Sequence, residues 1–277
     1  MSAYGTSDTR FPLKTQIFSY LCTMKKIVDF TIVARRQFGE HYFGWTLKSP
    51  ETLEPIKAGQ FVEVEVRDCN DVMLRRPISI HDFDLQAGTM DLLIQIVGKG
   101  TRKLATLKEG DKVNVIYPLG NGFAVSGKNP LLVGGGAGIA PLLGLAKAYK
   151  AQGVNPTILL GGRTEQLIPA REAFVGYSTL AFATEDGSLG EKGLVTQHTV
   201  FGQTYDHIAT CGPTPMMKAV AKSAHERNIP CEVSLENMMA CGVGACLCCV
   251  TDTDDGHKCV CKDGPVFNSE KILNFKS

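Results

Sequence analysis

Between residues 24 and 128, short runs of alternating apolar and polar residues follow one another, with glycine-containing turns between them. Residues 24–33 and 59–66 show this alternation, and residues 90–97 and 110–117 are two further strand-like runs next to glycine turns. A period of two is typical of a β-strand that is buried on one face and exposed on the other. Because few helical stretches separate the runs, we predict an antiparallel β-barrel over residues 24–128.

The pattern changes at about residue 129. Wholly apolar runs, as expected of parallel strands buried on both faces, now alternate with helical periodicity. The strands are predicted at 130–133, 157–162 and 207–213, and the helices at 141–151 and 215–227. We therefore predict a doubly wound α/β domain over residues 129–228, followed by a small cysteine-rich module at 229–277. The fold class is α+β multidomain.

Residues 1–23 are polar and irregular, unlike the rest of the chain, and the first strand pattern begins only at Met24. We interpret residues 1–23 as an extension that is either flexible or precedes the native start at Met24.

The charge balance restricts the kinds of partner. The chain has 277 residues, with 29 Lys and Arg against 28 Asp and Glu. This near-neutral balance argues against a nucleic-acid or membrane-surface partner. The longest apolar run, residues 131–146, contains five glycines and a proline, so we expect no transmembrane helix.

Six of the ten cysteines fall between Cys241 and Cys261. A disulfide framework would spread its cysteines along the chain, and no secretory signal is evident. The cluster therefore favours a metal site in a reducing compartment, and we expect the protein to be cytoplasmic.

Cys241, Cys246 and Cys249 have the C-x4-C-x2-C spacing of a plant-type [2Fe–2S] cluster. Gly242 and Gly244 let the loop curl tightly and bring backbone N–H groups toward the sulfurs. By spacing alone, the fourth ligand is Cys259 or Cys261. Zinc is the alternative metal, with Cys246 and Cys249 paired with Cys259 and Cys261 or with His257. Cys248 is expected to be a bystander.

A glycine-rich turn follows the strand at residues 130–133 and opens a helix that begins near Pro141. Small residues there let a pyrophosphate approach the backbone and the helix N-terminus. These small residues are Gly134, Gly135, Gly136 and Gly138. Since Arg163 rather than an acidic residue follows the next strand, the residues leave NAD and NADP both open.

Arg75 and Arg76 precede Pro77 among the barrel strands, where an arginine can offer a bidentate fork to a phosphate. Together with the glycine turn and Cys211-Gly212-Pro213, the segment resembles the ferredoxin–NADP reductase superfamily. The strings at 239–246 and 261–267 narrow the resemblance to electron-transfer subunits of class 1B dihydroorotate dehydrogenase, enzymes of pyrimidine biosynthesis. It covers essentially the whole chain from Met24 onward.

The resemblance implies cofactors and the residues that bind them. It selects Cys261 as the fourth cluster ligand, beside Cys241, Cys246 and Cys249. It implies FAD held by Arg76, Pro77, Ile78, Ser79, Leu93, Ile94, Gln95, Gly100 and Thr101, although relatives often carry Arg in place of Gln95. It also implies NAD framed by Gly134, Gly135, Gly136, Gly138, Cys211, Gly212 and Pro213.

The resemblance further implies an oxidoreductase subunit without catalytic side chains of its own, because the chemistry belongs to the cofactors. Its partner would be an FMN-containing dihydroorotate dehydrogenase subunit, in a heterotetramer with two copies of each chain. One alternative is the small subunit of another flavin and iron–sulfur reductase, of the ferredoxin reductase or sulfhydrogenase type. An alternative from a different class is a non-catalytic, zinc-stabilised binding module.

Overall fold

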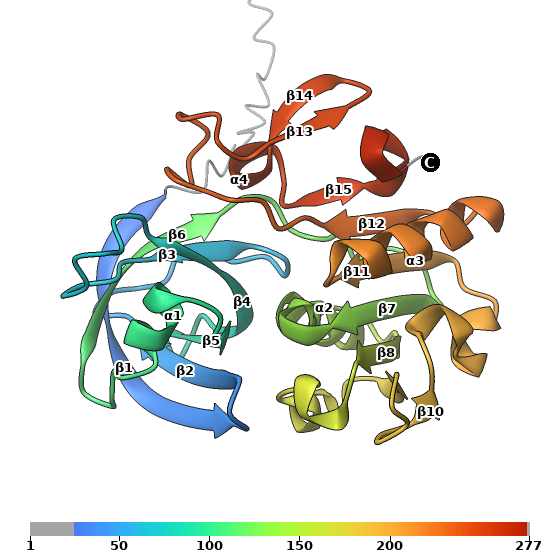
Figure 1. The fold of residues 1–277 in the computed structure, drawn as a ribbon, viewed down its shortest axis with the longest axis horizontal. Helices are drawn as coiled ribbons and strands as arrows, with labels where there is room; N and C mark the ends of the chain where they lie inside the picture. Colours follow the sequence, from blue (N-terminus) through green and yellow to red (C-terminus); the bar gives the residue numbers. More distant parts are fainter. Residues whose placement is uncertain (1–24, 276–277) are drawn as a thin grey trace, which may run out of the picture.

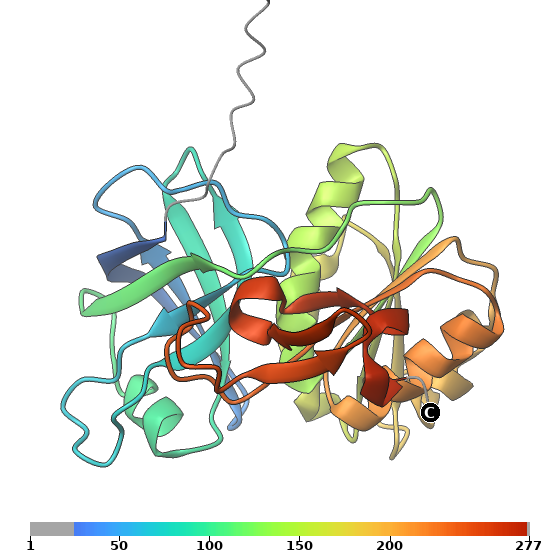
Figure 2. The ribbon, with the colours of Figure 1, turned by 90° about the horizontal axis from the view of Figure 1, so that it is seen from above.

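The computed structural model describes residues 25–275, which form a β-barrel, a sheet with helices on both faces and a small C-terminal module (Figure 1). The predicted extension at residues 1–23 lies outside the described residues. The C-terminal module lies over the junction between barrel and sheet, as the view from above shows (Figure 2). None of the helices in residues 25–275 has the length and apolar character needed to cross a membrane.

The barrel is closed in the strand order β1-β2-β5-β4-β3-β6, with every pair antiparallel. Its elements are β1 (Lys26–Phe38), β2 (Tyr42–Lys48), β3 (Phe61–Val64), β4 (Arg76–Asp84), β5 (Thr89–Gln95), α1 (Lys99–Leu104) and β6 (Lys112–Leu119). Alternate side chains, among them Phe30, Trp45 and Tyr117, fill its interior. The predicted antiparallel barrel is therefore confirmed.

Strand β3 departs from the half-buried pattern that its alternation predicted, because all four of its residues are buried. Val62 and Val64 point into the barrel core, as the period of two requires. Phe61 points outward into a second core that it shares with residues of the C-terminal module, and Glu63 is also buried. The C-terminal module covers the outer face of β3 and so removes it from solvent.

The sheet has the order β10-β9-β8-β7-β11-β12-β15, in which every pair is parallel except β12 with β15. Its strands are β7 (Pro130–Gly135), β8 (Thr157–Gly162), β9 (Thr179–Thr184), β10 (Glu191–Lys192), β11 (His207–Cys211), β12 (Cys231–Ser234) and β15 (Val266–Asn268). The helices are α2 (Ala140–Ala151) and α3 (Thr214–Glu226).

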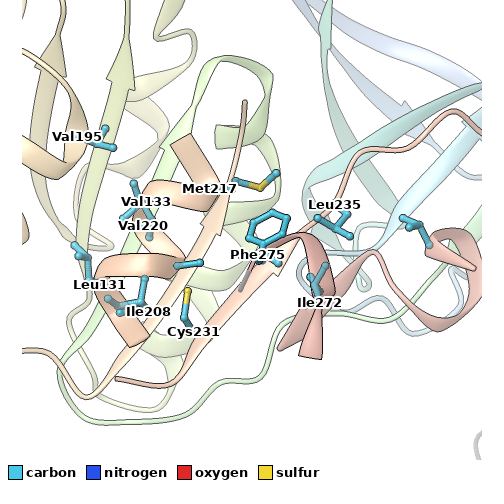
Figure 3. Close-up of a cluster of buried hydrophobic side chains, with 14 of the residues drawn as sticks. Leu131, Val133, Val195, Ile208, Met217, Val220, Cys231, Leu235, Ile272 and Phe275 are labelled. Atoms are coloured by element: carbon cyan, nitrogen blue, oxygen red, sulfur yellow. The ribbon is translucent and has the colours of Figure 1, made fainter. Parts of the chain in front are cut away.

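Helices α2 and α3 cover opposite faces of this sheet. Leu131 and Val133 of β7 belong to the core that contains Met217 of α3 (Figure 3). Leu132, between them, belongs to the core that contains Leu142 of α2. Successive residues of one strand thus meet different helices, which confirms the doubly wound α/β fold predicted from the apolar runs.

Single turns of 3-10 helix complete the regular structure of residues 25–275. They are η1 (Gly136–Ile139), η2 (Glu165–Leu167), η3 (Arg171–Phe174), η4 (Val195–Gln197), η5 (Thr199–Gly202), η6 (Ser269–Lys271) and η7 (Leu273–Phe275).

The C-terminal module consists of the cysteine loop, a hairpin and a short helix. The hairpin is formed by β13 (Val250–Thr253) and β14 (Gly256–Cys259), and α4 (Val260–Asp263) follows it. The module is joined to the sheet at both ends, since β12 precedes it and β15 follows it, with Ser234 paired with Val266. The domain limits at 128/129 and 228/229 stay predictions, to which the structure adds that two strands of the last segment complete the sheet.

Candidate functional site

Cys241 begins a tight loop whose backbone donates several N–H groups to its sulfur. Its Sγ accepts hydrogen bonds from the N–H groups of Val243 at 3.5 Å, Ala245 at 3.3 Å and Cys246 at 3.4 Å. Gly242 makes this turn possible, because its φ of +64° lies in the left-handed region that favours glycine. Burial raises the pKa of the Cys241 thiol, but the N–H donors outweigh burial and lower that pKa to about 6.

Cys249 and Cys261 form a second pair beside this loop. The N–H of Cys261 donates to Cys249 Sγ at 3.3 Å, and the N–H of Gly244 donates to Cys261 Sγ at 3.1 Å. Burial, followed by the neighbouring Cys249 side chain, raises the pKa of Cys261 to about 12. Cys259 instead donates its N–H to the Asp263 carboxylate at 2.8 Å. The geometry thus supports the selection of Cys261 over Cys259, which stays a prediction.

The sulfur positions can be tested against the two metals that the spacing allows. The Cys246 side chain lowers the pKa of Cys241, and the Cys249 side chain raises the pKa of Cys261. The thiols are therefore arranged as two neighbouring pairs. A cluster of two irons held by four thiolates needs such an arrangement. The donor set therefore fits a [2Fe–2S] cluster, with one pair of thiolates for each iron.

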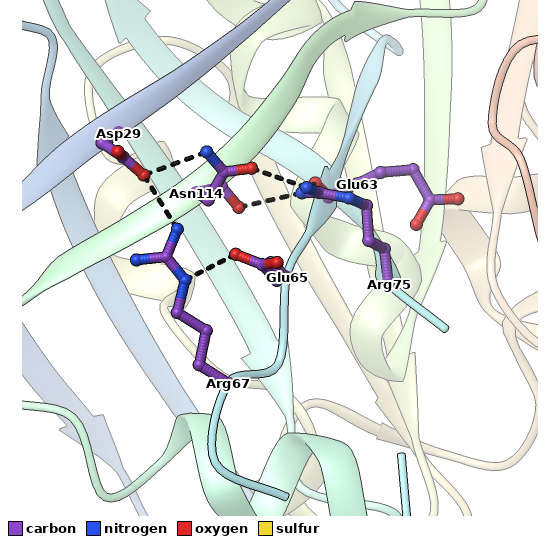
Figure 4. A network of polar contacts seen from close by, with 6 residues as sticks. All are labelled: Asp29, Glu63, Glu65, Arg67, Arg75 and Asn114. Atoms are coloured by element: carbon purple, nitrogen blue, oxygen red, sulfur yellow. Dashed lines mark hydrogen bonds and ion pairs between the residues drawn. The ribbon is translucent and has the colours of Figure 1, made fainter. Parts of the chain in front are cut away.

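Arg75 and Arg76 have different surroundings, although they are neighbours. The Arg75 guanidinium donates to the Glu63 carbonyl oxygen at 3.3 Å, to the Asn114 carbonyl oxygen at 3.2 Å and to Asn114 Oδ1 at 2.6 Å. Figure 4 shows Arg75 at the end of a polar network that continues through Asn114 to Asp29 and Arg67. Arg75 is therefore a structural residue that ties β3 to β6.

Arg76 is half-buried, and its guanidinium has no hydrogen-bond or ion-pair partner among residues 25–275. It approaches the start of α1 so closely that a Cβ on Gly100 would lie 2.6 Å from Arg76 Nε. A larger residue at position 100 would therefore displace the Arg76 side chain from this position. A partly buried cation without an ion-pair partner fits a site for a phosphate, as the resemblance to FAD-binding barrels implies. Thr101 has a local role, because its hydroxyl accepts the N–H groups of Val97 and Gly98.

The remaining residues predicted for FAD do not all point toward one site. Pro77, Ile78 and Ser79 are partly exposed on β4, directly after Arg76. Ile94 points into the barrel core, so only its backbone can face a ligand, whereas Leu93 lies on the opposite face of β5 and packs in the core beside α2. Gln95, at the end of β5, instead lines the large cavity between the barrel and the sheet.

This cavity, of about 600 Å³, lies at the carboxyl ends of the parallel strands. Such a position is where open α/β sheets bind their ligands. Most of the predicted nucleotide residues line it: Gly135, Gly136, Gly138, Gly212 and Pro213. Gly134 lies behind the cavity wall, where a Cβ would lie 2.8 Å from Leu142 Cδ1 of α2. The glycine turn thus combines ligand-facing glycines with one that permits helix packing.

Two backbone segments meet at the floor of the cavity. A Cβ on Gly138 would lie 2.4 Å from the backbone carbon and oxygen of Cys211 and from the nitrogen of Gly212. Gly212 has a φ of +150° and turns the chain away from β11. Burial raises the pKa of Cys211 far above its ordinary value, so the residue is a neutral thiol at physiological pH. The glycine turn and residues 211–212 are therefore in direct backbone contact, which a side chain at position 138 would prevent.

Several residues of the cavity escaped the sequence patterns. Tyr42, from β2, is almost fully buried, and Glu236 lies directly before the cysteine loop. Both line the cavity beside the glycine turn. Only the position of Glu236 next to the cysteine loop could have pointed to it, since nothing in the barrel pattern distinguishes Tyr42. Arg163, which the sequence already pointed to at the end of β8, lines the same wall, together with Glu185 at the end of β9.

Family models match two separate parts of the chain. Residues 236–273 match the iron–sulfur cluster binding domain of dihydroorotate dehydrogenase B, and residues 38–123 match the oxidoreductase FAD-binding domain. The first match contains all the cysteines of the loop and of α4, and the second contains Arg76 and the rest of the predicted flavin strand.

Curated relatives match most of the chain. The dihydroorotate dehydrogenase B (NAD(+)) electron transfer subunit of Caldanaerobacter subterraneus subsp. tengcongensis is 42% identical over 84% of this chain and 92% of its own length. The subunit with the same name from Bacillus velezensis is 37% identical over 90% of this chain and 99% of its own length.

Solved structures agree on the fold. A chain from the structure of an NADH-dependent reduced ferredoxin–NADP oxidoreductase, described in connection with flavin-based electron bifurcation, has a TM-score of 0.80 and 34% identity. The match covers 88% of this chain and 89% of that one. The ferredoxin reductase of carbazole 1,9a-dioxygenase, at 19% identity and a TM-score of 0.65, shares the fold over 74% of this chain and 67% of its own.

Proposed function

The chain belongs to the family of dihydroorotate dehydrogenase B electron-transfer subunits, and from this premise we propose which residues carry the electrons and between which partners. It is an oxidoreductase subunit that uses FAD, an iron–sulfur cluster and NAD. One observation carries the proposal: the nucleotide cavity is lined by Glu236, which lies shortly before the cysteine loop, and by Gln95 at the end of β5, the strand that pairs with the flavin strand β4. A bound cluster supplies one-electron transfer, and bound FAD links it to the two-electron chemistry of NAD⁺.

Cys241, Cys246, Cys249 and Cys261 hold the cluster in this proposal. The backbone of the loop prepares the sulfurs for iron, because its N–H groups already point at Cys241 and Cys261. N–H donors to a ligating sulfur stabilise its negative charge and raise the potential of the bound metal. Gly244 has a φ of +83°, and a Cβ there would lie 2.8 Å from Lys262 Cδ, so the loop needs glycine at this position.

Arg76 is proposed to pair with the FAD pyrophosphate, with Gly100 leaving room for the approach. Pro77, Ile78 and Ser79 follow Arg76 along β4 and would orient the ring system. The role of Arg75 is to hold β3 and β6 together behind that strand.

The glycine turn and residues 211–213 are proposed to receive NAD⁺ on the sheet side of the cavity. The turn offers backbone N–H groups at the start of η1 and α2, where the N-terminal end of a helix favours the pyrophosphate. Cys211, as a buried neutral thiol, adds no charge beside the nicotinamide.

The proposed electron donor is an FMN-containing subunit that oxidises dihydroorotate to orotate. It would dock over the cysteine loop, in a cytoplasmic complex of two copies of each chain. Around this loop the side chains of Met238, Val243 and Leu247 are exposed, with 85% of Met238 accessible. Exposed apolar side chains around a metal-binding loop are typical of a protein interface.

Co-purification from the native cell tests this proposal. The chain should be recovered with a second, FMN-containing protein and should show the absorption of both flavin and iron–sulfur. The complex should reduce NAD⁺ rather than NADP⁺ with dihydroorotate, whereas the isolated chain should form no orotate. Orotate formation by the isolated chain, or a colourless chain, would contradict the proposal.

The similarity to the NADH-dependent ferredoxin–NADP oxidoreductase chain supports one alternative, in which the donor or acceptor is ferredoxin. The same preparation separates the two functions. Electron exchange with ferredoxin, together with no response to dihydroorotate in the presence of the co-purified partner, would favour the alternative.

A further inference from the structure

Glu63 is a buried acidic residue in a strand whose polar positions were expected to face solvent. Only 1% of it is accessible. Its side chain points out of the barrel, where the cysteine loop covers it. A Cβ on Gly242 would lie 2.8 Å from Glu63 Cγ and 3.3 Å from its Oε1. The carboxyl group is therefore packed directly against the turn that follows Cys241.

Both carboxylate oxygens of Glu63 lack a hydrogen-bond partner among residues 25–275. A buried carboxylate without donors is costly, and native proteins keep such groups rarely. Figure 4 shows its carboxylate directed away from the polar network of Arg75 and Asn114. Glu65, two residues along the chain, has the ordinary arrangement, with a 2.6 Å ion pair to Arg67 at the surface.

The position of Glu63 places it between the two proposed redox sites. Across the ladder it pairs with Pro77, the residue that follows Arg76 on the flavin strand. On its other side lies the Cys241 loop. The charges that act on its carboxyl come from both sites, since Arg75 and Arg76 favour ionisation and Cys241 opposes it.

We propose that Glu63 is a positioning residue of the electron path, whose negative charge between the flavin strand and the cysteine loop keeps the reduction potential of the cluster low. This inference rests on the proposed function, since it presupposes that the loop holds a cluster. Reduction adds one negative charge to the cluster. An ionised carboxylate nearby, in a region from which water is excluded, disfavours that step.

The backbone around Glu63 is held without help from the carboxyl group. The carbonyl oxygen of Glu63 accepts a hydrogen bond from Arg75, and β3 is paired on both sides, with β4 and with β6. Replacing the carboxylate by an amide of the same shape therefore changes charge while leaving these contacts in place. This separates an electrostatic role from a structural one.

The test is a redox titration of the full-length chain with its iron and flavin, followed by electron paramagnetic resonance and visible absorption. Burial raises the pKa of Glu63 to about 7, so measurements at pH 8.5 compare a mostly ionised carboxyl with a neutral amide. In Glu63→Gln, the reduction equilibrium of the cluster should shift tenfold or more toward the reduced form, equivalent to 59 mV for a one-electron couple. Glu65→Gln should stay within twofold of the wild type, and Glu63→Asp within threefold.

Equal cluster potentials in Glu63→Gln and the wild type, with iron and flavin retained, would overturn the inference. Loss of iron from Glu63→Gln, with iron retained in Glu65→Gln, would also overturn it. The carboxyl group would then be needed to hold the cluster and would not set its reduction potential. A failure of the proposed function would look different, since the wild-type chain itself would then contain no iron–sulfur cluster to titrate.

Discussion

Replacing Gly138 by alanine should disrupt the nucleotide site and leave the other cofactors in place. The added Cβ would lie 2.4 Å from three backbone atoms of Cys211 and Gly212, where ordinary contacts begin near 3.4 Å. Rigid backbone occupies this space, so the glycine turn must move by about 1 Å to restore normal van der Waals contact. Overpacking of this kind typically costs about 1–3 kcal/mol.

If that free energy is taken from nucleotide binding, the dissociation constant for NADH should rise by roughly 5- to 150-fold, since each 1.4 kcal/mol is a factor of ten. The assay is NADH-dependent dye reduction by the full chain, with the Michaelis constant for NADH as readout. Flavin and iron–sulfur absorption should be unchanged, because their proposed ligands lie elsewhere, on β4, β5 and α1 for the flavin and on the cysteine loop and α4 for the cluster.

Gly144→Ala is the matched control. Its Cβ would meet Ala58 Cβ at an ordinary 3.4 Å, and alanine within α2 favours the helix by about 1 kcal/mol over glycine. This variant should keep the wild-type Michaelis constant and melt at the same or a higher temperature. A wild-type Michaelis constant in Gly138→Ala would refute the assignment of this turn to the nucleotide.

Three further predictions concern the cluster, the flavin and the pH dependence of stability. Cys261→Ser should lose iron and the iron–sulfur absorption, whereas Cys259→Ser should keep both, as an iron assay can show; the reverse result would exchange their roles. Arg76→Ala should lower flavin content without lowering the melting temperature of the apoprotein, while Arg75→Ala should destabilise the fold by about 1.5–3 kcal/mol through loss of its hydrogen bonds to β3 and β6. Burial lowers the pKa of His81, so the unfolded state binds its proton more readily, and stability should fall as the pH drops below about 6.5. Denaturant unfolding at pH 7.5 and 5.5 should show a smaller loss in His81→Gln than in the wild type.

Most of the fold could be predicted from local patterns. The helix predicted at 141–151 is observed as Ala140–Ala151, and the strand predicted at 157–162 as Thr157–Gly162. These elements have strong periodicity and lie between clear turn residues, so their boundaries depend on neighbouring residues in the chain. The glycine turn and the cysteine motif could be recognised for the same reason, since the functional residues of each lie close together in the sequence.

The residues that sequence patterns missed depend on contacts between distant segments. Alternation in residues 59–66 predicts that Glu63 faces solvent, yet a loop almost 180 residues later covers it. Tyr42 reaches the nucleotide cavity from the second barrel strand, next to Gly136 of the sheet. In the sequence, Arg75 and Arg76 form one basic motif. Only the folded structure shows that the Arg75 guanidinium is hydrogen-bonded to Asn114. No local pattern encodes these partners.

The pairing of Ser234 with Val266 has a consequence for protein engineering. Because the two residues are neighbours across β12 and β15, everything from 235 to 265 is an insertion whose ends already meet. A tight hairpin turn could replace it and leave the seven-stranded sheet intact. The shortened chain would keep the flavin strand β4 and the glycine turn, but would lack all four proposed cluster ligands and Glu236 of the cavity wall. Phe61 and Glu63, which the excised segment covers, are the first positions to redesign for solvent.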